Sequence, residues 1–231
     1  MIGTLINIAT VLVGGVFGLL FGSRLSDRFR ETVIAGLGLF VLGYGLSNFI
    51  QTKNPLIVLG SVLVGSLLGE WWKIEAGLQK LAVFLETRFS GADKTSNRFV
   101  RGFLTASILF CVGPMTILGS LQNGLSGNYS ILATKAVLDG FAALAFTSTL
   151  GVGVMFSVLV ILVYQGGISL LAAQLNHLIT TPMMTELTAT GGILLVGIAI
   201  SSLLEIKHIR MGNFLPALII APLIVAVLAH F

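Results

Sequence analysis

The sequence predicts an all-α membrane protein, a polytopic bundle of about eight transmembrane helices in a single integral membrane domain, 1–231. Hydrophobic residues make up 55% of the chain and charged residues 10%, and the mean hydropathy is +1.01. A soluble domain carries about 25% charged residues. Apolar runs of about 20 residues, the length that crosses a bilayer as a helix, recur along the chain. The expected partner of these apolar helices is therefore the lipid bilayer. The net charge of +4 does not indicate nucleic-acid binding.

The apolar runs define eight candidate spans, with boundaries set to within a few residues. They cover about 3–22, 32–51, 55–72, 100–121, 130–149, 152–174, 187–204 and 213–230. Only residues 148–153 separate the fifth and sixth, so these two could form a tight hairpin or a broken pair. The first and sixth spans share similar strings, VLVGGVFGLL and VYQGGISLL. This similarity suggests a weak inverted repeat, an arrangement common in secondary transporters.

Positive charges set the expected orientation. Among the 13 Lys and Arg residues, all but Lys53 and Lys135 fall in the first, third and seventh loops between spans. Successive spans cross the membrane in opposite directions, so these three loops lie on the same side of it. Because cytoplasmic loops carry the excess of Lys and Arg, the chain is expected to be N-out and C-out. The longest of these loops, 73–98, has apolar residues at helical spacing and predicts an amphipathic helix on the cytoplasmic side, on the membrane surface or packed on the bundle.

Two ionisable residues lie inside the fifth span. Lys135 and Asp139 are four positions apart, so on a helix they share a face and can pair. A charge at membrane depth costs roughly 2.5–3.5 kcal/mol on insertion scales unless it is paired or faces water. We expect the pair to line a binding site for a small solute or ion. The alternative is a buried ion pair that fixes helix register.

The fourth span supplies the other candidate residues. Gly113 and Pro114 interrupt it, because proline removes a helical hydrogen bond and kinks the helix. A broken helix lined by amides and hydroxyls is typical of a substrate site, so the sequence predicts a polar site between spans four and five. The polar residues expected to line it are Thr116, Ser120, Gln122 and Asn123, with Gln165 on span six and Asn7 on span one as further partners of the charged pair.

Glycines at a spacing of four predict close helix contacts, either within the bundle or in a homo-oligomer. They are Gly14, Gly18 and Gly22 on span one, and Gly65 and Gly69 on span three. Glu70 follows them, next to two tryptophans that are typical of a membrane interface, and we expect it to be interfacial.

The sequence predicts no metal site, no cofactor and no enzymatic activity. The three histidines are far apart, and no HExxH motif or phosphate-binding glycine loop is present. The GLSG string around Ser126 matches that of rhomboid-type proteases, but no histidine is placed to activate the serine. Apart from Asp139, no Asp or Glu is expected deep in a span. A transporter or channel is thus favoured over a membrane scaffold or sensor subunit, and an intramembrane hydrolase is the weakest alternative.

Four segments, GTLINIATVLVGGVFGLLFG, CVGPMTILGSLQNGL, KAVLDGFAALAFTSTLGVGVMFS and LLEIKHIRMGNFLPALIIAPL, extend over most of the chain. They resemble the YqgA/YdfK family of bacterial inner-membrane proteins, which is grouped under a domain of unknown function. The resemblance implies a multi-helix protein of the bacterial cytoplasmic (inner) membrane and brings no substrate. Asn123 stands where the family usually has Asp, which argues against a metal site at that position.

Overall fold

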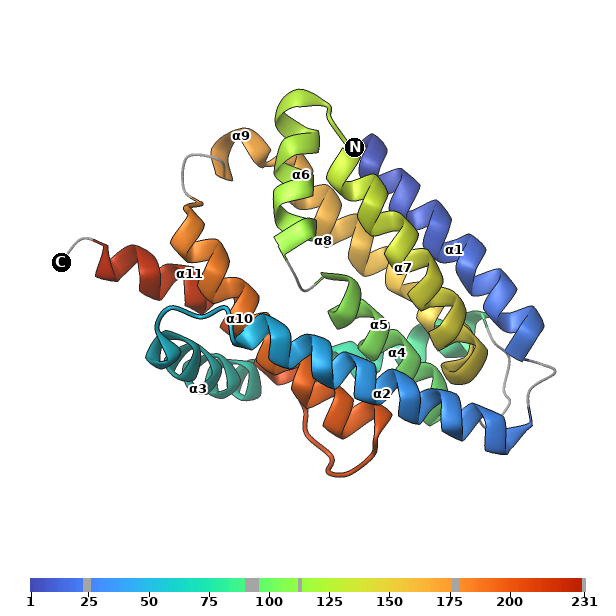
Figure 1. Cartoon of the computed structure of the whole chain (residues 1–231). Coiled ribbons are helices and arrows are strands. Elements are labelled where there is room, and N and C mark those ends of the chain that lie inside the picture. Colours follow the sequence, from blue (N-terminus) through green and yellow to red (C-terminus); the bar gives the residue numbers. More distant parts are fainter. Residues whose placement is uncertain (23–25, 90–95, 112–113, 176–178, 230–231) are drawn as a thin grey trace. The chain divides into compact units, whose positions relative to one another are not determined.

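The computed structural model describes residues 1–22, 26–89, 96–111, 114–175 and 179–229, and these form helices joined by short connections (Figure 1). The helices are α1 (Ile2–Gly22), α2 (Asp27–Phe49), α3 (Pro55–Trp72), α4 (Ile74–Phe89), α5 (Ser96–Cys111), α6 (Pro114–Ser126), α7 (Ser130–Leu150), α8 (Val158–Leu170), α9 (Ala172–Leu175), α10 (Thr181–Ile198) and α11 (Ala217–Leu228), with the short helical turns η1 (Val152–Ser157), η2 (Ala199–Leu203) and η3 (Met211–Phe214).

Within the described residues, 7 helices are long and apolar enough to cross a membrane, and the number is 8 if the bent pair α5–α6 counts as one span. The prediction of an all-α bundle with about eight spans is confirmed. The fourth span is not one straight helix, because its two halves are bent by 62°. Pro114 begins the second half, whereas Gly113 lies outside the described residues.

Capping residues determine where α3 and α10 begin. Asn54 accepts a hydrogen bond from the Leu56 N–H, and Pro55 occupies the first turn of α3. Thr180 caps α10 in the same way. The seventh span therefore begins at Thr181, six residues earlier than predicted, because the cap starts the helix while the sequence is still polar.

The connection between the fifth and sixth spans is a tight hairpin. α7 ends at Leu150, and Gly151 has a φ of 82°, a left-handed conformation that favours glycine. The chain then continues through η1 into α8, which runs opposite to α7.

The helices group into two compact units. Unit 1 contains α1, α5, most of α6, α7, η1, α8 and α9, with the first part of α2 and most of α4; unit 2 contains the rest of α2 and α4 with α3, α10, η2, η3 and α11.

In unit 1, α1 lies along α7 in the same direction (Figure 1). A Cβ added at Gly14 would collide with the carbonyl of Gly140, and one at Gly22 would collide with the backbone of Ser148. The glycine face predicted on span one therefore packs within the chain. α8 runs opposite to α1, since Gly15 faces Met155, near the start of the α8 span.

In unit 2, α3 packs against α11 in the opposite direction. Gly65 meets the backbone of Ala217, and Gly69 meets that of Asn213. Gly45 of α2 contacts Gly192 of α10 equally closely. The glycines predicted on span three thus also serve contacts inside the chain. The helix directions in both units are those of spans that cross a membrane in alternation.

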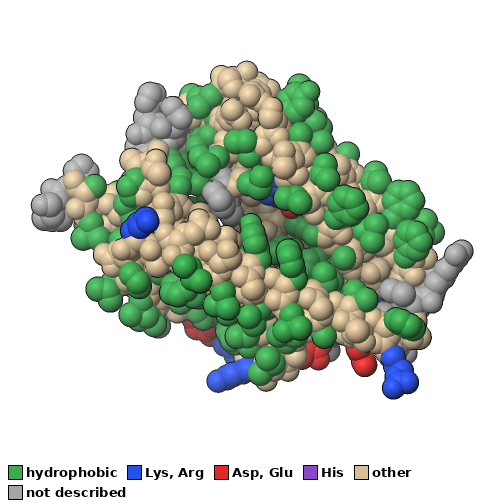
Figure 2. Space-filling view, viewed as in Figure 1, with side chains coloured by type: hydrophobic (Ala, Val, Ile, Leu, Met, Phe, Trp, Pro, Cys, Tyr) green, Lys and Arg blue, Asp and Glu red, His purple; other side chains and the backbone are tan. Residues whose placement is uncertain are grey.

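The predicted amphipathic helix is α4. Its buried Ala82 and Leu85 join a core cluster with Phe99 and Phe103 of α5, so this part of the helix packs on unit 1. The outer surfaces of the long helices carry large apolar side chains, with few charged groups among them (Figure 2). Exposed apolar surface of this extent is typical of contact with lipid.

Candidate functional site

The predicted charged pair forms on α7. The Lys135 ammonium donates to Asp139 Oδ2, and the two residues are only 5% and 8% exposed. Asp139 is the tenth of the 21 residues of α7. At 1.5 Å per residue it lies about 14 Å from the start of the helix, near the middle of a span. The pair is therefore deep in the bundle by its position along the helix as well as by its burial.

Two amide side chains extend the pair into a network. Asn7 Nδ2 donates to Asp139 Oδ2 at 2.9 Å and to Gln165 Oε1 at 3.1 Å. Asn7 lies seven residues, about two turns, before Gly14 on the face of α1 that contacts α7, and the close glycine contacts let it approach Asp139. Three spanning helices, α1, α7 and α8, thus contribute to one buried polar network. It unites Lys135, Asp139, Asn7 and Gln165, four of the predicted site residues.

The fourth span contributes an aromatic ring. Lys135 Nζ lies 6.0 Å from the centroid of the Phe110 ring, at the outer limit of a cation–π contact. The buried Thr116 hydroxyl donates to the Phe110 carbonyl at 3.3 Å. The sequence predicted a polar site between spans four and five. The hydrogen-bonded network instead joins span five to spans one and six, because the glycine seam draws α1 against α7.

In the part of the chain that the structure describes, the other predicted residues of α6 make no hydrogen bond to Lys135 or Asp139. Asn123 donates to the Gly127 carbonyl at 3.3 Å. The hydroxyl of Ser120 and the side-chain oxygen of Gln122 are buried and have no hydrogen-bond partner among the described residues. Ser126, of the GLSG string, donates to the Gln122 carbonyl at 2.9 Å.

A second buried carboxylate, Glu186, was not predicted from the sequence. Glu186, in the second turn of α10, is 3% exposed. It accepts hydrogen bonds from the Thr52 hydroxyl at 2.5 Å and from the backbone N–H groups of Lys53 at 2.8 Å and Asn54 at 3.2 Å. The predicted span 187–204 starts one residue after Glu186 and therefore excluded it, whereas α10 begins at Thr181 and includes Glu186 in its second turn. Thr180 followed by a proline in the first turn was the signal that could have corrected this.

Glu186 holds the α2–α3 connection to α10, and its replacement should weaken unit 2. Glu186→Gln can keep an oxygen at the backbone N–H groups of Lys53 and Asn54, but its NH₂ group then replaces the oxygen that accepts from the Thr52 hydroxyl. A buried donor left without an acceptor costs about 1–3 kcal/mol, so we expect a loss of that size in a denaturant titration. Glu31→Gln makes the same change at an exposed glutamate of α2 and should alter stability by less than about 0.5 kcal/mol. Equal stabilities of the two variants would contradict this role.

A third polar cluster lies where α3 meets α4 and η3. Asn213 donates to Glu70 Oε2 at 2.5 Å and accepts from the Glu75 N–H at 2.7 Å. Glu75 in turn accepts from the Gly212 N–H at 2.6 Å, and Arg210 pairs with the half-exposed Glu70 at 2.7 Å. These bonds join segments about 140 residues apart, so no local pattern in the sequence could indicate them. These bonds hold the end of α3 and the start of α4 against η3, and we call them the α3–α4–η3 cluster.

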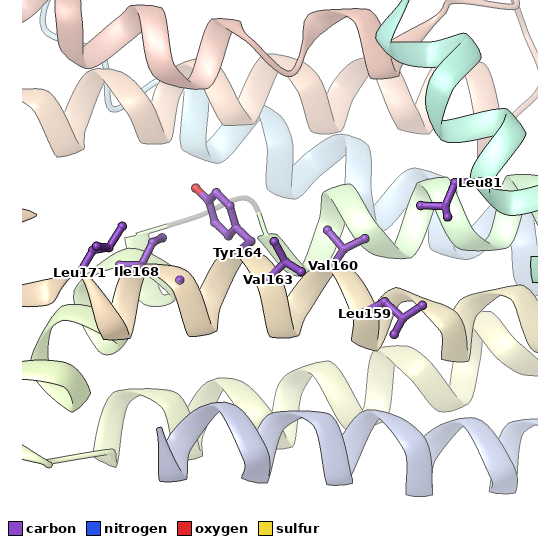
Figure 3. Close-up of a pocket in the computed structure, with 8 residues that line it drawn as sticks. Leu81, Leu159, Val160, Val163, Tyr164, Ile168 and Leu171 are labelled. Atoms are coloured by element: carbon purple, nitrogen blue, oxygen red, sulfur yellow. The ribbon is translucent and has the colours of Figure 1, made fainter.

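Unit 1 also has an apolar groove along one face of α8, with a volume of about 580 Å³ (Figure 3). Its lining is hydrophobic apart from the Tyr164 hydroxyl, and Tyr164 and Ile168 point into it from α8. Gln165 lies on a different face of the helix, so the groove is separate from the charged network. Among the described residues, no group of three or more His, Cys, Asp and Glu side chains is placed to hold a metal ion.

Comparison with known proteins gives a family without an assigned activity. A family model described as "Protein of unknown function (DUF554)" matches residues 2–226. The chain is 31% identical over 235 residues to the "Uncharacterized membrane protein YdfK" of Bacillus subtilis (strain 168), with 100% of this chain and 98% of the relative covered. It is 34% identical over 235 residues to the "Uncharacterized protein YqgA" of Escherichia coli (strain K12), with 100% and 99% covered. No solved structure matches the chain. The predicted resemblance is confirmed, and the chain belongs to the DUF554 family.

Proposed function

We propose that this membrane protein is a transporter or channel for a small cation or proton, with Asp139 as the binding group. The observation that carries the proposal is the buried network in which Asp139 of α7 is reached by Lys135 and Asn7. Charged residues inside membrane spans are costly and commonly mark an ion pathway or a proton relay. A purely structural contact between α1 and α7 would not need them, because the glycine seam already brings these helices together.

The network offers a simple exchange of partners. In the empty site Lys135 is the counter-charge of Asp139. A cation or proton that binds Asp139 neutralises the carboxylate and releases the Lys135 ammonium, which can then turn to the Phe110 ring. Asn7 contacts both Asp139 and Gln165, so it can pass this change from α7 to α8.

We place the site in the bacterial cytoplasmic (inner) membrane with both chain ends outside. The support is the concentration of Lys and Arg in alternating loops. On this orientation the network extends from Asp139, near the middle of the membrane, into the outer half, because α1 and α7 both begin on the outer side and Asn7 lies in the second turn of α1. The protein would act through its own side chains, without a metal or cofactor and without enzymatic turnover.

Ion flux into proteoliposomes tests the proposal. The wild type should move protons, reported by an entrapped pH-sensitive dye, or a monovalent cation, reported by its radioactive isotope. Asp139→Asn keeps the size of the side chain and removes its charge, so its flux should fall to the level of protein-free liposomes. Glu186→Gln is the matched control, a carboxylate-to-amide change at a buried position of another span, and it should retain flux per folded molecule. Wild-type flux in Asp139→Asn, or none in the wild type, would contradict the proposal.

A further inference from the structure

Two atoms of the charged network are buried and have no hydrogen-bond partner among the described residues. They are Asn7 Oδ1 and Gln165 Nε2, and their side chains are 0% and 1% exposed. Nearly all buried polar groups in proteins have a partner. Each of these atoms is one end of an amide group whose other end is bonded, since Asn7 Nδ2 donates to Asp139 Oδ2 and to Gln165 Oε1. The network therefore uses only one end of each amide.

A half-turn of both amide groups would give the two unpartnered atoms a bond to each other. The oxygen and the NH₂ group of an amide are so alike in size that they are nearly indistinguishable at ordinary resolution, so the exchange needs no additional space. After it, Asn7 Oδ1 takes the place of Asn7 Nδ2, and Gln165 donates to Asn7 instead of accepting from it. The contact between α1 and α8 is retained, with the direction of its hydrogen bond reversed.

The charge on Asp139 decides between these two arrangements. An ionised carboxylate only accepts hydrogen bonds, so it requires the NH₂ end of Asn7 and would face an oxygen after the half-turn. A protonated Asp139 has an O–H group, which Asn7 Oδ1 can accept. One proton on Asp139 therefore favours the reversed arrangement, in which the Asp139 hydroxyl and the Gln165 NH₂ group both donate to Asn7 Oδ1.

A metal ion suits this site less well than a proton. Ca²⁺ and Mg²⁺ require about six or more oxygen ligands, and K⁺ is bound by rings of oxygen atoms that replace its hydration shell. Among the described residues, the two groups that bond to Asp139 are both donors, the Lys135 ammonium and the Asn7 NH₂ group. The ammonium would also repel a metal ion. A proton requires only one acceptor atom and no added volume, which fits a carboxylate that is 8% exposed.

The titratable side chains near Asp139 come from α7 and α5. Lys135 lies one turn away on α7, and Cys111 at the end of α5 is close enough to interact electrostatically with both members of the pair. The side chains that α1 and α8 contribute to the network, Asn7 and Gln165, are uncharged amides. Lysine and cysteine side chains ordinarily hold their protons at neutral pH, so Asp139 is the group here that can take one up.

We propose that the ion bound by Asp139 is a proton, and that its binding reverses the hydrogen bond between Asn7 and Gln165. The inference rests on the proposed function, in which Asp139 binds the transported ion, and it names that ion. The bond formed is an O–H bond on the Asp139 carboxylate, the proton comes from the aqueous phase, and Lys135 keeps its own proton. The reversal reports the protonation of α7 to α8 through α1.

Infrared difference spectroscopy of the protein in phosphatidylcholine vesicles, with ¹³C in the aspartate side-chain carboxyl groups, tests the identity of the ion. Acidification should produce a carboxylic-acid C=O band that is absent from Asp139→Asn. At constant pH, replacing choline chloride by the chloride of Na⁺, K⁺ or Mg²⁺ should leave the carboxylate bands of Asp139 unchanged. The absence of the acid band, or Asp139 carboxylate bands that shift with one of these metal ions, would overturn the proposal.

A second label, ¹³C in the side-chain carbonyls of Asn and Gln, tests the reversal. Acidification should lower the C=O frequency of Asn7, which gains hydrogen bonds, and raise that of Gln165, which loses one. The two bands are assigned by their loss in Asn7→Leu and Gln165→Leu. Asn7→Leu should also abolish the Gln165 shift, because Asn7 connects Gln165 to Asp139.

Asn48→Leu is the matched control, because it removes another buried asparagine, on α2, and it should leave the Gln165 shift intact. A Gln165 band that does not respond to pH, or that responds equally in Asn7→Leu, would overturn the reversal. These spectra do not depend on transport. Protonation and reversal without flux of any ion would support the inference and reject the proposed function. Metal-ion flux that is lost in Asp139→Asn, with no proton uptake by Asp139, would support the proposed function and overturn the inference.

Discussion

Lys135→Met is expected to destabilise the protein by about 3–5 kcal/mol, the cost of removing one partner from a buried ion pair. Methionine keeps the length of the side chain but leaves the Asp139 carboxylate buried with Asn7 as its remaining donor. The effect should appear as a lower midpoint in a detergent-based unfolding titration, with less folded protein recovered from membranes. It should exceed the effect of losing Asn7, since interhelical hydrogen bonds in membranes average about 0.6 kcal/mol.

Lys53→Met is the matched control, because it removes an exposed lysine side chain from the α2–α3 connection. It should change stability by less than about 0.5 kcal/mol. If Lys135→Met were as stable as Lys53→Met, Lys135 would not compensate a buried charge, and the site described here would be wrong.

Gly14→Ala is expected to destabilise the protein by about 1–3 kcal/mol, because the added methyl group overpacks the contact between α1 and α7. The added Cβ would meet the backbone carbonyl of Gly140, and backbone cannot turn aside as a flexible side chain can. The displacement would separate α1 from α7 and lengthen the Asn7–Asp139 hydrogen bond, so flux per folded molecule should fall as well.

Gly43→Ala makes the same change on α2, where nothing lies within 4 Å of the added Cβ. It should raise stability by up to about 1 kcal/mol, because alanine favours helix over glycine. Opposite signs for the two variants in one unfolding assay would support the glycine seam. A Gly14→Ala protein as stable as Gly43→Ala would contradict it.

The sequence predicted the spans well because membrane helices leave a simple local signal, a run of apolar residues of bilayer length. It also indicated Asn7, Gln165, Lys135 and Asp139, since polar side chains inside such runs are rare and conspicuous. Which helices would bring them together was not predictable, because the glycine faces that select partners look alike on several spans. The site was therefore expected between spans four and five, whereas the contacts run from span five to spans one and six.

Glu186 shows where the signal of hydropathy fails. Its helix begins with a polar turn, so a search for apolar runs starts the span too late and misses a carboxylate that is buried by its contacts with the α2–α3 connection. The α3–α4–η3 cluster, with Asn213 and Glu75, could not be predicted from the sequence for another reason. Its bonds depend on two helix ends that meet only in the folded chain.

Flux through the double variant Lys135→Met/Asp139→Leu tests the central claim most directly. Replacing a buried ion pair by hydrophobic residues of similar volume is often neutral or stabilising, so this protein should fold and insert as well as the wild type. If the network binds the transported ion, the folded double variant should show no flux above protein-free liposomes. Wild-type flux in this variant would show that Lys135 and Asp139 are a structural pair and would contradict the account.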